Sequence, residues 1–151
     1  MIALTRSSAR SFRAAARKLF GARSRGPAPP VFLEIRQGRM TLSVRSPEAW
    51  LAFTTETTAA EMAISFPMAV LEAVEGSDDS RVVLQIGGNL RGSAHWTDAG
   101  RALRHPFAAK RSTPAELLPE EPTQWKPQST HLLDALHECG RIATGVAEST
   151  R

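Results

Sequence analysis

The chain has 151 residues, 42% of them hydrophobic, so its length fits one domain with a sizeable core. No run of 18 apolar residues occurs, so we expect no membrane-spanning helix; the single cysteine, Cys139, excludes an internal disulfide and suits a reducing cytosol. The net charge of +4 is uneven, because seven of the 19 basic residues precede Glu34 and no acidic residue does. Such a basic end favours binding to phosphate, to an anionic membrane or to an import receptor.

Residues 2–20 are expected to form a short strand over 2–5 and then a helix over 8–20, capped by Ser7 or Ser8. Apolar residues recur in this helix at the spacing of one buried face, namely Phe12, Ala15, Ala16, Leu19 and Phe20. A neighbouring stripe of the helix is basic and consists of Arg6, Arg10, Arg13 and Arg17. Gly21 is expected to end the helix.

A hydrophobic period of two after residue 30 predicts β-strands. Residues 31–35 and 40–44 flank a four-residue turn and predict a hairpin, and a strand over 50–55 follows. A further short strand is expected over 62–64. After it, Ser65 is expected to cap a short helix that ends at Gly76.

The rest of the chain repeats this order of elements. Strands are expected over 81–86, 90–96 and 101–108. Because Pro106 lacks an N–H group, it indicates either that the last strand lies at a sheet edge or that Pro106 lies at the end of the strand. A loop over 110–122 leads to a strand over 123–126. A final helix begins at Ser129 or Thr130, and its apolar face comprises Leu132, Leu133, Leu136, Cys139 and Ala143.

The predicted order is therefore β-α-β-β-β twice, in units of about 60 residues, followed by the start of a third. Two helices on one face of an antiparallel sheet make an α+β architecture. We expect one domain over residues 1–122 and an incomplete second domain over 123–151.

Several segments resemble the bacterial DNA polymerase III beta subunit, a family of DNA sliding clamps. Residues 12–20 are similar to its first helix, and 33–44 to its first hairpin. Residues 64–67 resemble the start of its second helix, and 130–139 the first helix of its second domain. Arg45-Ser46-Pro47-Glu48 stands where the family usually has a Thr-Asp pair.

The resemblance implies a sliding-clamp fold that encircles duplex DNA without reading its sequence, and that tethers a DNA polymerase. The helix over 8–20 would then lie on the inner wall of the ring. The expected phosphate contacts are Arg10, Arg13 and Arg17 in this helix and Arg23 and Arg25 in the loop after it. The polymerase and the clamp loader would bind through C-terminal parts missing here. The full-length protein is expected to form a homo-oligomeric ring in the cytoplasm, and this chain, taken as a fragment, a monomer.

Other interpretations stay open at this point. The basic stripe also fits a solvated helix face or a mitochondrial-type presequence. A clamp-derived interaction domain, or a small basic nucleic-acid-binding domain that forms no ring, is the alternative function.

We expect no enzymatic activity, no cofactor and no metal site. Asp98 lies near His95 in the sequence, but no nucleophile motif accompanies them. His131, His137 and Cys139 do not share one helical face. The tryptophans lack interleaved arginines, which favours packing over base stacking; they are Trp50, Trp96 and Trp125.

Overall fold

The computed structural model describes residues 1–20, 28–46, 49–113, 131 and 134–135. The chain divides into two compact units, residues 1–118 and 119–151. Every helix and strand with defined bounds lies in the first unit. In the second unit, residues 131 and 134–135 are helical. The predicted strand over 123–126 and most of the predicted last helix, Cys139 included, lie outside the described residues.

The first unit contains the predicted order of elements twice. The first run comprises β1 (Ile2–Thr5), α1 (Arg6–Phe20), β2 (Val31–Arg36), β3 (Arg39–Arg45) and β4 (Trp50–Glu56). The second run comprises β5 (Met62–Phe66), α2 (Ala69–Val74), β6 (Arg81–Ile86), β7 (Arg91–Asp98) and β8 (Arg101–Ala108). A two-residue strand, β9 (Lys110–Arg111), follows where a loop was predicted; it is too short to leave a pattern in the sequence.

The strands form two antiparallel sheets, so the expectation of a single sheet is wrong. One sheet has the order β1-β6-β7-β8 and the other the order β4-β3-β2-β5-β9. The first strand of each run pairs with the opposite run, because β1 is hydrogen-bonded to β6 and β5 to β2. Each sheet therefore needs a strand from the other half of the unit, which no local sequence pattern reveals.

Thr5, and not the predicted Ser7 or Ser8, caps the start of the first helix. Its Oγ1 accepts a hydrogen bond of 3.1 Å from the backbone N–H of Ser8, as an N-cap residue does. The helix therefore starts at Arg6, directly after β1. Ser65 is likewise not a cap, because β5 continues through it to Phe66 and α2 begins only at Ala69.

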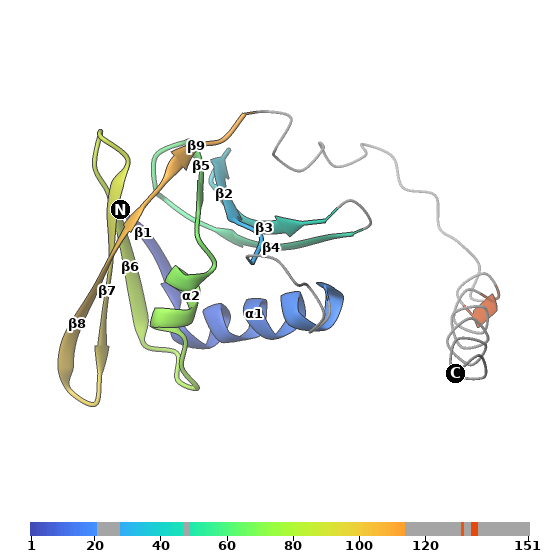
Figure 1. The fold of residues 1–151 in the computed structure, drawn as a ribbon, viewed down its shortest axis with the longest axis horizontal. Helices are drawn as coiled ribbons and strands as arrows, with labels where there is room; N and C mark the ends of the chain where they lie inside the picture. The colour runs from blue at the N-terminus through green and yellow to red at the C-terminus, as the bar shows by residue number, and fades with distance from the viewer. Residues whose placement is uncertain (21–27, 47–48, 114–130, 132–133, 136–151) are drawn as a thin grey trace. The chain divides into compact units, whose positions relative to one another are not determined.

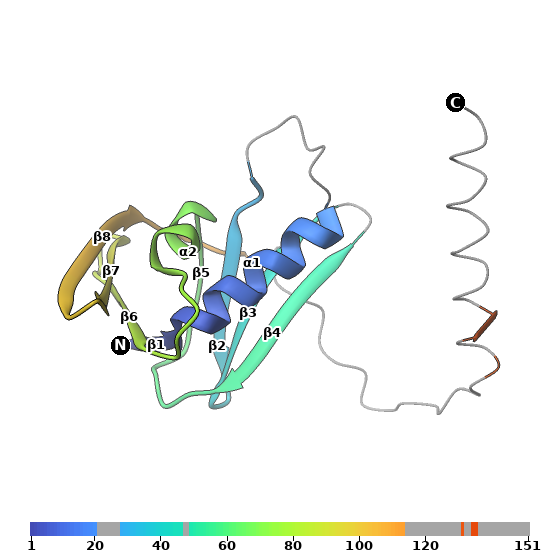
Figure 2. The ribbon, with the colours of Figure 1, turned by 90° about the horizontal axis from the view of Figure 1, so that it is seen from below.

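The two helices contact each other in the angle between the two sheets (Figures 1 and 2). α1 also contacts β1 and β4, whereas α2 contacts β7 and β8. The core that they close is fully apolar at its centre and includes Phe12, Leu33, Phe66, Leu71 and Leu84. Leu19, predicted to be buried, is 45% exposed. Among the described residues, no helix combines the length and the apolar character that a membrane span requires.

The β7–β8 pair shows why particular residues stand at particular positions. β8 is an edge strand, which is one of the two alternatives that Pro106 indicated, and Pro106 faces Ser93 across the pair. Phe107 faces Gly92, and its ring packs on Phe66 with centroids 5.6 Å apart. A Cβ atom at Gly92 would lie 2.5 Å from Cζ of Phe107, so only glycine leaves room for this ring.

We therefore expect Gly92→Ala to lower the free energy of unfolding by about 1–3 kcal/mol, as overpacking of a core does. Gly88→Ala is the matched control, because a Cβ there meets no atom within 4 Å. Urea denaturation measures both. The double variant Gly92→Ala/Phe107→Leu should lose less stability than the two single variants together. Equal losses for Gly88→Ala and Gly92→Ala would contradict the steric argument.

Candidate nucleic-acid interface

One face of α1 carries exposed positive charge. Arg10, Arg17 and Lys18 are all exposed, and they lie on one side of the helix with Ser11 and Ala14 between them. The helix contains no acidic residue. No carboxylate of the described residues forms an ion pair with these three cations. The face is therefore an un-neutralised cationic surface, of the kind that attracts phosphate.

Arg13, which the resemblance implied as a phosphate contact, is buried and does not belong to this surface. Its side chain is only 6% exposed. Nη2 lies 3.2 Å from Oε1 of Glu72, and Nη1 contacts Oε1 of Glu75. Its row of the helix, between Ala9 and Ala16, faces α2 and the core. The glutamates come from a distant part of the sequence, so the helical pattern alone could not show the burial.

Arg6, the first member of the predicted stripe, is also buried. Its Nη1 donates to Oδ2 of Asp78 and to Oδ1 of Asp98, at 2.9 Å in each case. Its Nε donates to the carbonyl oxygen of Val74 at 3.3 Å. A Cβ at Gly76 would lie 2.6 Å from this guanidinium, so the chain after α2 passes directly over it. Arg6 thus links the start of α1 to the α2–β6 loop and the β7–β8 turn.

The remaining predicted phosphate contacts, Arg23 and Arg25, lie outside the described residues. So do His137 and Cys139, while His131 is exposed. Among the residues that the structure does describe, no three His, Cys, Asp or Glu side chains gather as metal ligands.

The histidine of β7 has a serine partner, and no acidic partner among the residues that the structure describes. Oγ of Ser93 and Nε2 of His95 are 2.8 Å apart. Asp98 has the opposite parity on β7, so it projects from the other face, where Arg6 binds it. The strand therefore separates Asp98 from His95, although they are close in sequence. Ser, His and Asp do not line up here as they do in a hydrolytic site.

Trp50 has an arginine beside it, against the sequence-based interpretation. The Cζ atom of Arg45 lies 5.4 Å from the centroid of the Trp50 ring and 5.7 Å from that of Phe32. Arg45 faces Trp50 across the β3–β4 pair, which the hairpin spacing could have revealed. Trp96 packs against the core instead, and Trp125 lies outside the described residues.

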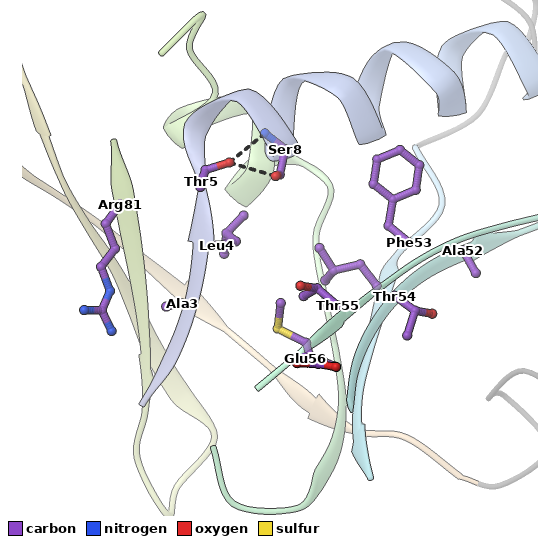
Figure 3. Close-up of a pocket in the computed structure, with 12 residues that line it drawn as sticks. Ala3, Leu4, Thr5, Ser8, Ala52, Phe53, Thr54, Thr55, Glu56 and Arg81 are labelled. Atoms are coloured by element: carbon purple, nitrogen blue, oxygen red, sulfur yellow. Dashed lines mark hydrogen bonds between the residues drawn. The ribbon is translucent and has the colours of Figure 1, made fainter. Parts of the chain in front are cut away.

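A cavity of about 670 Å³ opens between β1, the start of α1 and β4 (Figure 3). Leu4, Met40, Leu42 and Phe53 give it an apolar floor. Phe53 packs edge-on against Phe12, with ring centroids 5.4 Å apart. The charged groups at its margin, Glu56 and Arg81, lie at separate sides of the opening in Figure 3. This cavity has no cluster of groups that would bind an anion.

No family model matches the chain, and neither a search of curated proteins nor one of solved structures finds a match. The functional argument therefore rests on the chain's own residues and their geometry.

We expect Arg13→Met to lower the free energy of unfolding by about 1–3 kcal/mol. The effect stays below that of breaking a fully buried pair, because Glu72 is 62% exposed and stays hydrated. Arg10→Met is the control; it removes the same charge from an exposed position, where changes are usually within about 0.5 kcal/mol. Urea denaturation measures both variants, and equal effects would contradict a structural role for Arg13.

The carboxyl group of Asp78 should make a small contribution to the stability of the fold, and this contribution should depend on pH. Hydrogen bonds from the Ser80 side chain and backbone, together with the Arg6 guanidinium, hold the pKa of Asp78 below its ordinary 3.8. A carboxyl whose pKa falls on folding stabilises the fold above its unfolded pKa, and this contribution is lost as the pH falls through the folded value. Asp78→Asn and Ser80→Ala should therefore both flatten the acid side of a plot of melting temperature against pH. A slope unchanged in both variants would contradict the assignment.

Proposed function

We propose that this chain forms a domain of a DNA sliding clamp, which holds duplex DNA without reading its sequence and tethers a DNA polymerase. The observation that carries the proposal is the exposed, acid-free face of α1 with Arg10, Arg17 and Lys18. The two β-α-β-β-β runs, which exchange their first strands and set their helices side by side, support it. The resemblance of residues 12–20 and 33–44 to clamp segments points the same way.

The chemistry of this face suits a loose hold on a phosphate backbone. Guanidinium and ammonium groups on long side chains attract phosphates without selecting a base, because base edges are read by closely fitted polar contacts in the grooves. α1 offers three such groups on one side: Arg10, and about two turns further along the helix Arg17 with Lys18 next to it. A protein held by phosphate contacts alone remains free to slide along the duplex.

The proposal includes the partners that the resemblance implies. Several such domains would close a ring around DNA in the cytoplasm, and a DNA polymerase and a clamp loader would bind to that ring. Arg23 and Arg25, which follow α1, would add to the cationic surface. Arg13 is not part of it, because it is buried against Glu72 and Glu75.

One observation favours a second candidate, a clamp-derived domain that binds nucleic acid or protein without forming a ring. α2 contributes no cation to the helix pair, and its Glu72 is 62% exposed beside α1. Of these two helices, only α1 therefore carries positive charge. A ring wall built from both helices would be less attractive to phosphate than one in which both carry arginines.

Retention on circular DNA separates the two candidates. A closed ring stays on a nicked circular plasmid at high salt and leaves once the plasmid is cut, because its hold is topological. A surface binder leaves both forms equally, since salt screens its phosphate contacts. Gel filtration of protein–DNA mixtures before and after cutting distinguishes these outcomes. Retention on the uncut circle alone would reject the second candidate, which forms no ring.

We expect Arg10→Ser/Arg17→Ser/Lys18→Ser to weaken duplex binding and to reduce the salt dependence. Removing three phosphate contacts should lower the log–log slope of affinity against salt by about 2.7. Fluorescence anisotropy of a labelled duplex over a salt series measures it. Arg101→Ser/Lys110→Ser/Arg111→Ser removes equal charge from β8 and β9 and should keep most of the slope. Equal slopes for the α1 variant and the unaltered protein would reject the assignment of this face.

A further inference from the structure

The four-stranded sheet has a polar outer face that the proposed function does not use. Its inner face carries the core residues Ile2, Leu84 and Ala94, which lie in one row across β1, β6 and β7. The outer face is built from the alternate positions of the same strands. Val83, His95 and Arg104 form one row across it.

This outer face is cationic. Arg81 lies two residues from Val83 on β6, and Arg91 lies four residues from His95 on β7, so both share the face of Arg104. All three arginines are exposed. The outward positions of the four strands include no aspartate or glutamate. No carboxylate of the described residues pairs with any of the three.

His95 adds a second feature at the centre of the face. It lies directly opposite Arg104, and side chains in such cross-strand pairs have Cβ atoms about 4.5–5.5 Å apart. Nε2 of His95 already has Oγ of Ser93 as its hydrogen-bond partner. His95 therefore places a hydrogen-bonded ring beside the cation of Arg104.

We propose that the outer face of the β1-β6-β7-β8 sheet binds the phosphate backbone of nucleic acid, as a surface separate from that of α1. From strand spacing and rise, the Cα atoms of Arg81, Arg91 and Arg104 lie about 12–21 Å from one another. That span matches about four to six nucleotides at 3.4 Å per nucleotide of one strand. The face is therefore broad enough to contact several phosphates of one strand.

The side chains around the arginines favour nucleic acid over an acidic protein. Protein interfaces centre on aromatic or large apolar residues. No outward residue of these four strands is among the exposed large hydrophobics of the described chain. Gln85 and Thr97, which are both exposed, supply hydrogen-bonding groups instead. Interfaces with nucleic acid are polar and positively charged in this way.

The same composition predicts which nucleic acids bind. Base stacking on single strands uses exposed aromatic rings. Among the outward positions of the four strands, His95 alone has an aromatic ring. Contacts are then limited to the backbone. The face binds single strands and duplexes alike, and without preference for sequence.

The test compares two triple variants of the full chain that remove equal charge. Arg81→Gln/Arg91→Gln/Arg104→Gln alters the sheet face, and Arg10→Ser/Arg17→Ser/Lys18→Ser alters α1. Fluorescence anisotropy is measured over a salt series with labelled oligothymidylate, which is single-stranded, and with a labelled blunt-ended duplex. In the sheet variant, the log–log slope of affinity against salt should be smaller by about 2.1 for the single strand and by about 2.7 for the duplex. An unchanged slope in the sheet variant overturns this proposal, whereas an unchanged slope in the α1 variant overturns only the proposed function.

Further variants keep the outcome decisive. Replacing the same three arginines by lysine preserves the charge and should preserve the slope, which shows that charge and not the fold is responsible. If the triple variant does not fold, Arg104→Gln alone should lower the slope by about 0.7 on the single strand. Polyglutamate provides the other arm. If it binds the unaltered protein, and only that binding is lost in the sheet variant, the partner is an acidic protein and the proposal is wrong.

Discussion

β1 is hydrogen-bonded to β6, and β5 to β2, so neither half of the first unit completes a sheet from its own strands. The core follows from this exchange. Ile2 packs in a row with Leu84 of the second run, and Leu33 lies opposite Ile64. Because hydrophobic burial drives folding only when both partners are present, one half alone would leave these residues in water. The exchange of strands also determines where the helices lie, because α1 follows β1 directly and α2 follows β5 closely.

Two buried guanidinium groups link the two halves of the first unit through ion pairs. Arg6 links the start of α1 to Asp78 and Asp98, and Arg13 links the middle of α1 to Glu72 and Glu75. A buried cation costs free energy unless it is paired and hydrogen-bonded, so these arginines require the acidic residues where they are. All charged residues of α1 are basic, but they have two different roles. Two of its arginines stabilise the fold, and only the others remain for a ligand.

The sequence predicted what depends on neighbours along the chain. The β2–β3 hairpin, the order of elements up to residue 108 and the edge position of the strand with Pro106 all follow from local pattern and turn chemistry, and all are confirmed. Predictions failed where a distant partner decides. Arg13 is buried because Glu72 and Glu75 lie across the helix pair, and the single predicted sheet became two because β1 pairs with a strand that begins at Arg81. Arg45 beside Trp50 is an intermediate case, visible once the hairpin register is known.

The distribution of acidic residues explains how a chain of modest net charge presents cationic surfaces. Four carboxylates, on Glu72, Glu75, Asp78 and Asp98, neutralise two buried arginines and so do not offset the exposed ones. Glu34 and Glu56 lie on the other sheet, on strands that do not join β6, β7 or β8. The face of α1 and the outer face of the four-stranded sheet therefore keep their positive charge. The same ion pairs therefore have two effects. They link the two halves of the first unit, and they keep these four carboxylates away from the surfaces where phosphate would bind.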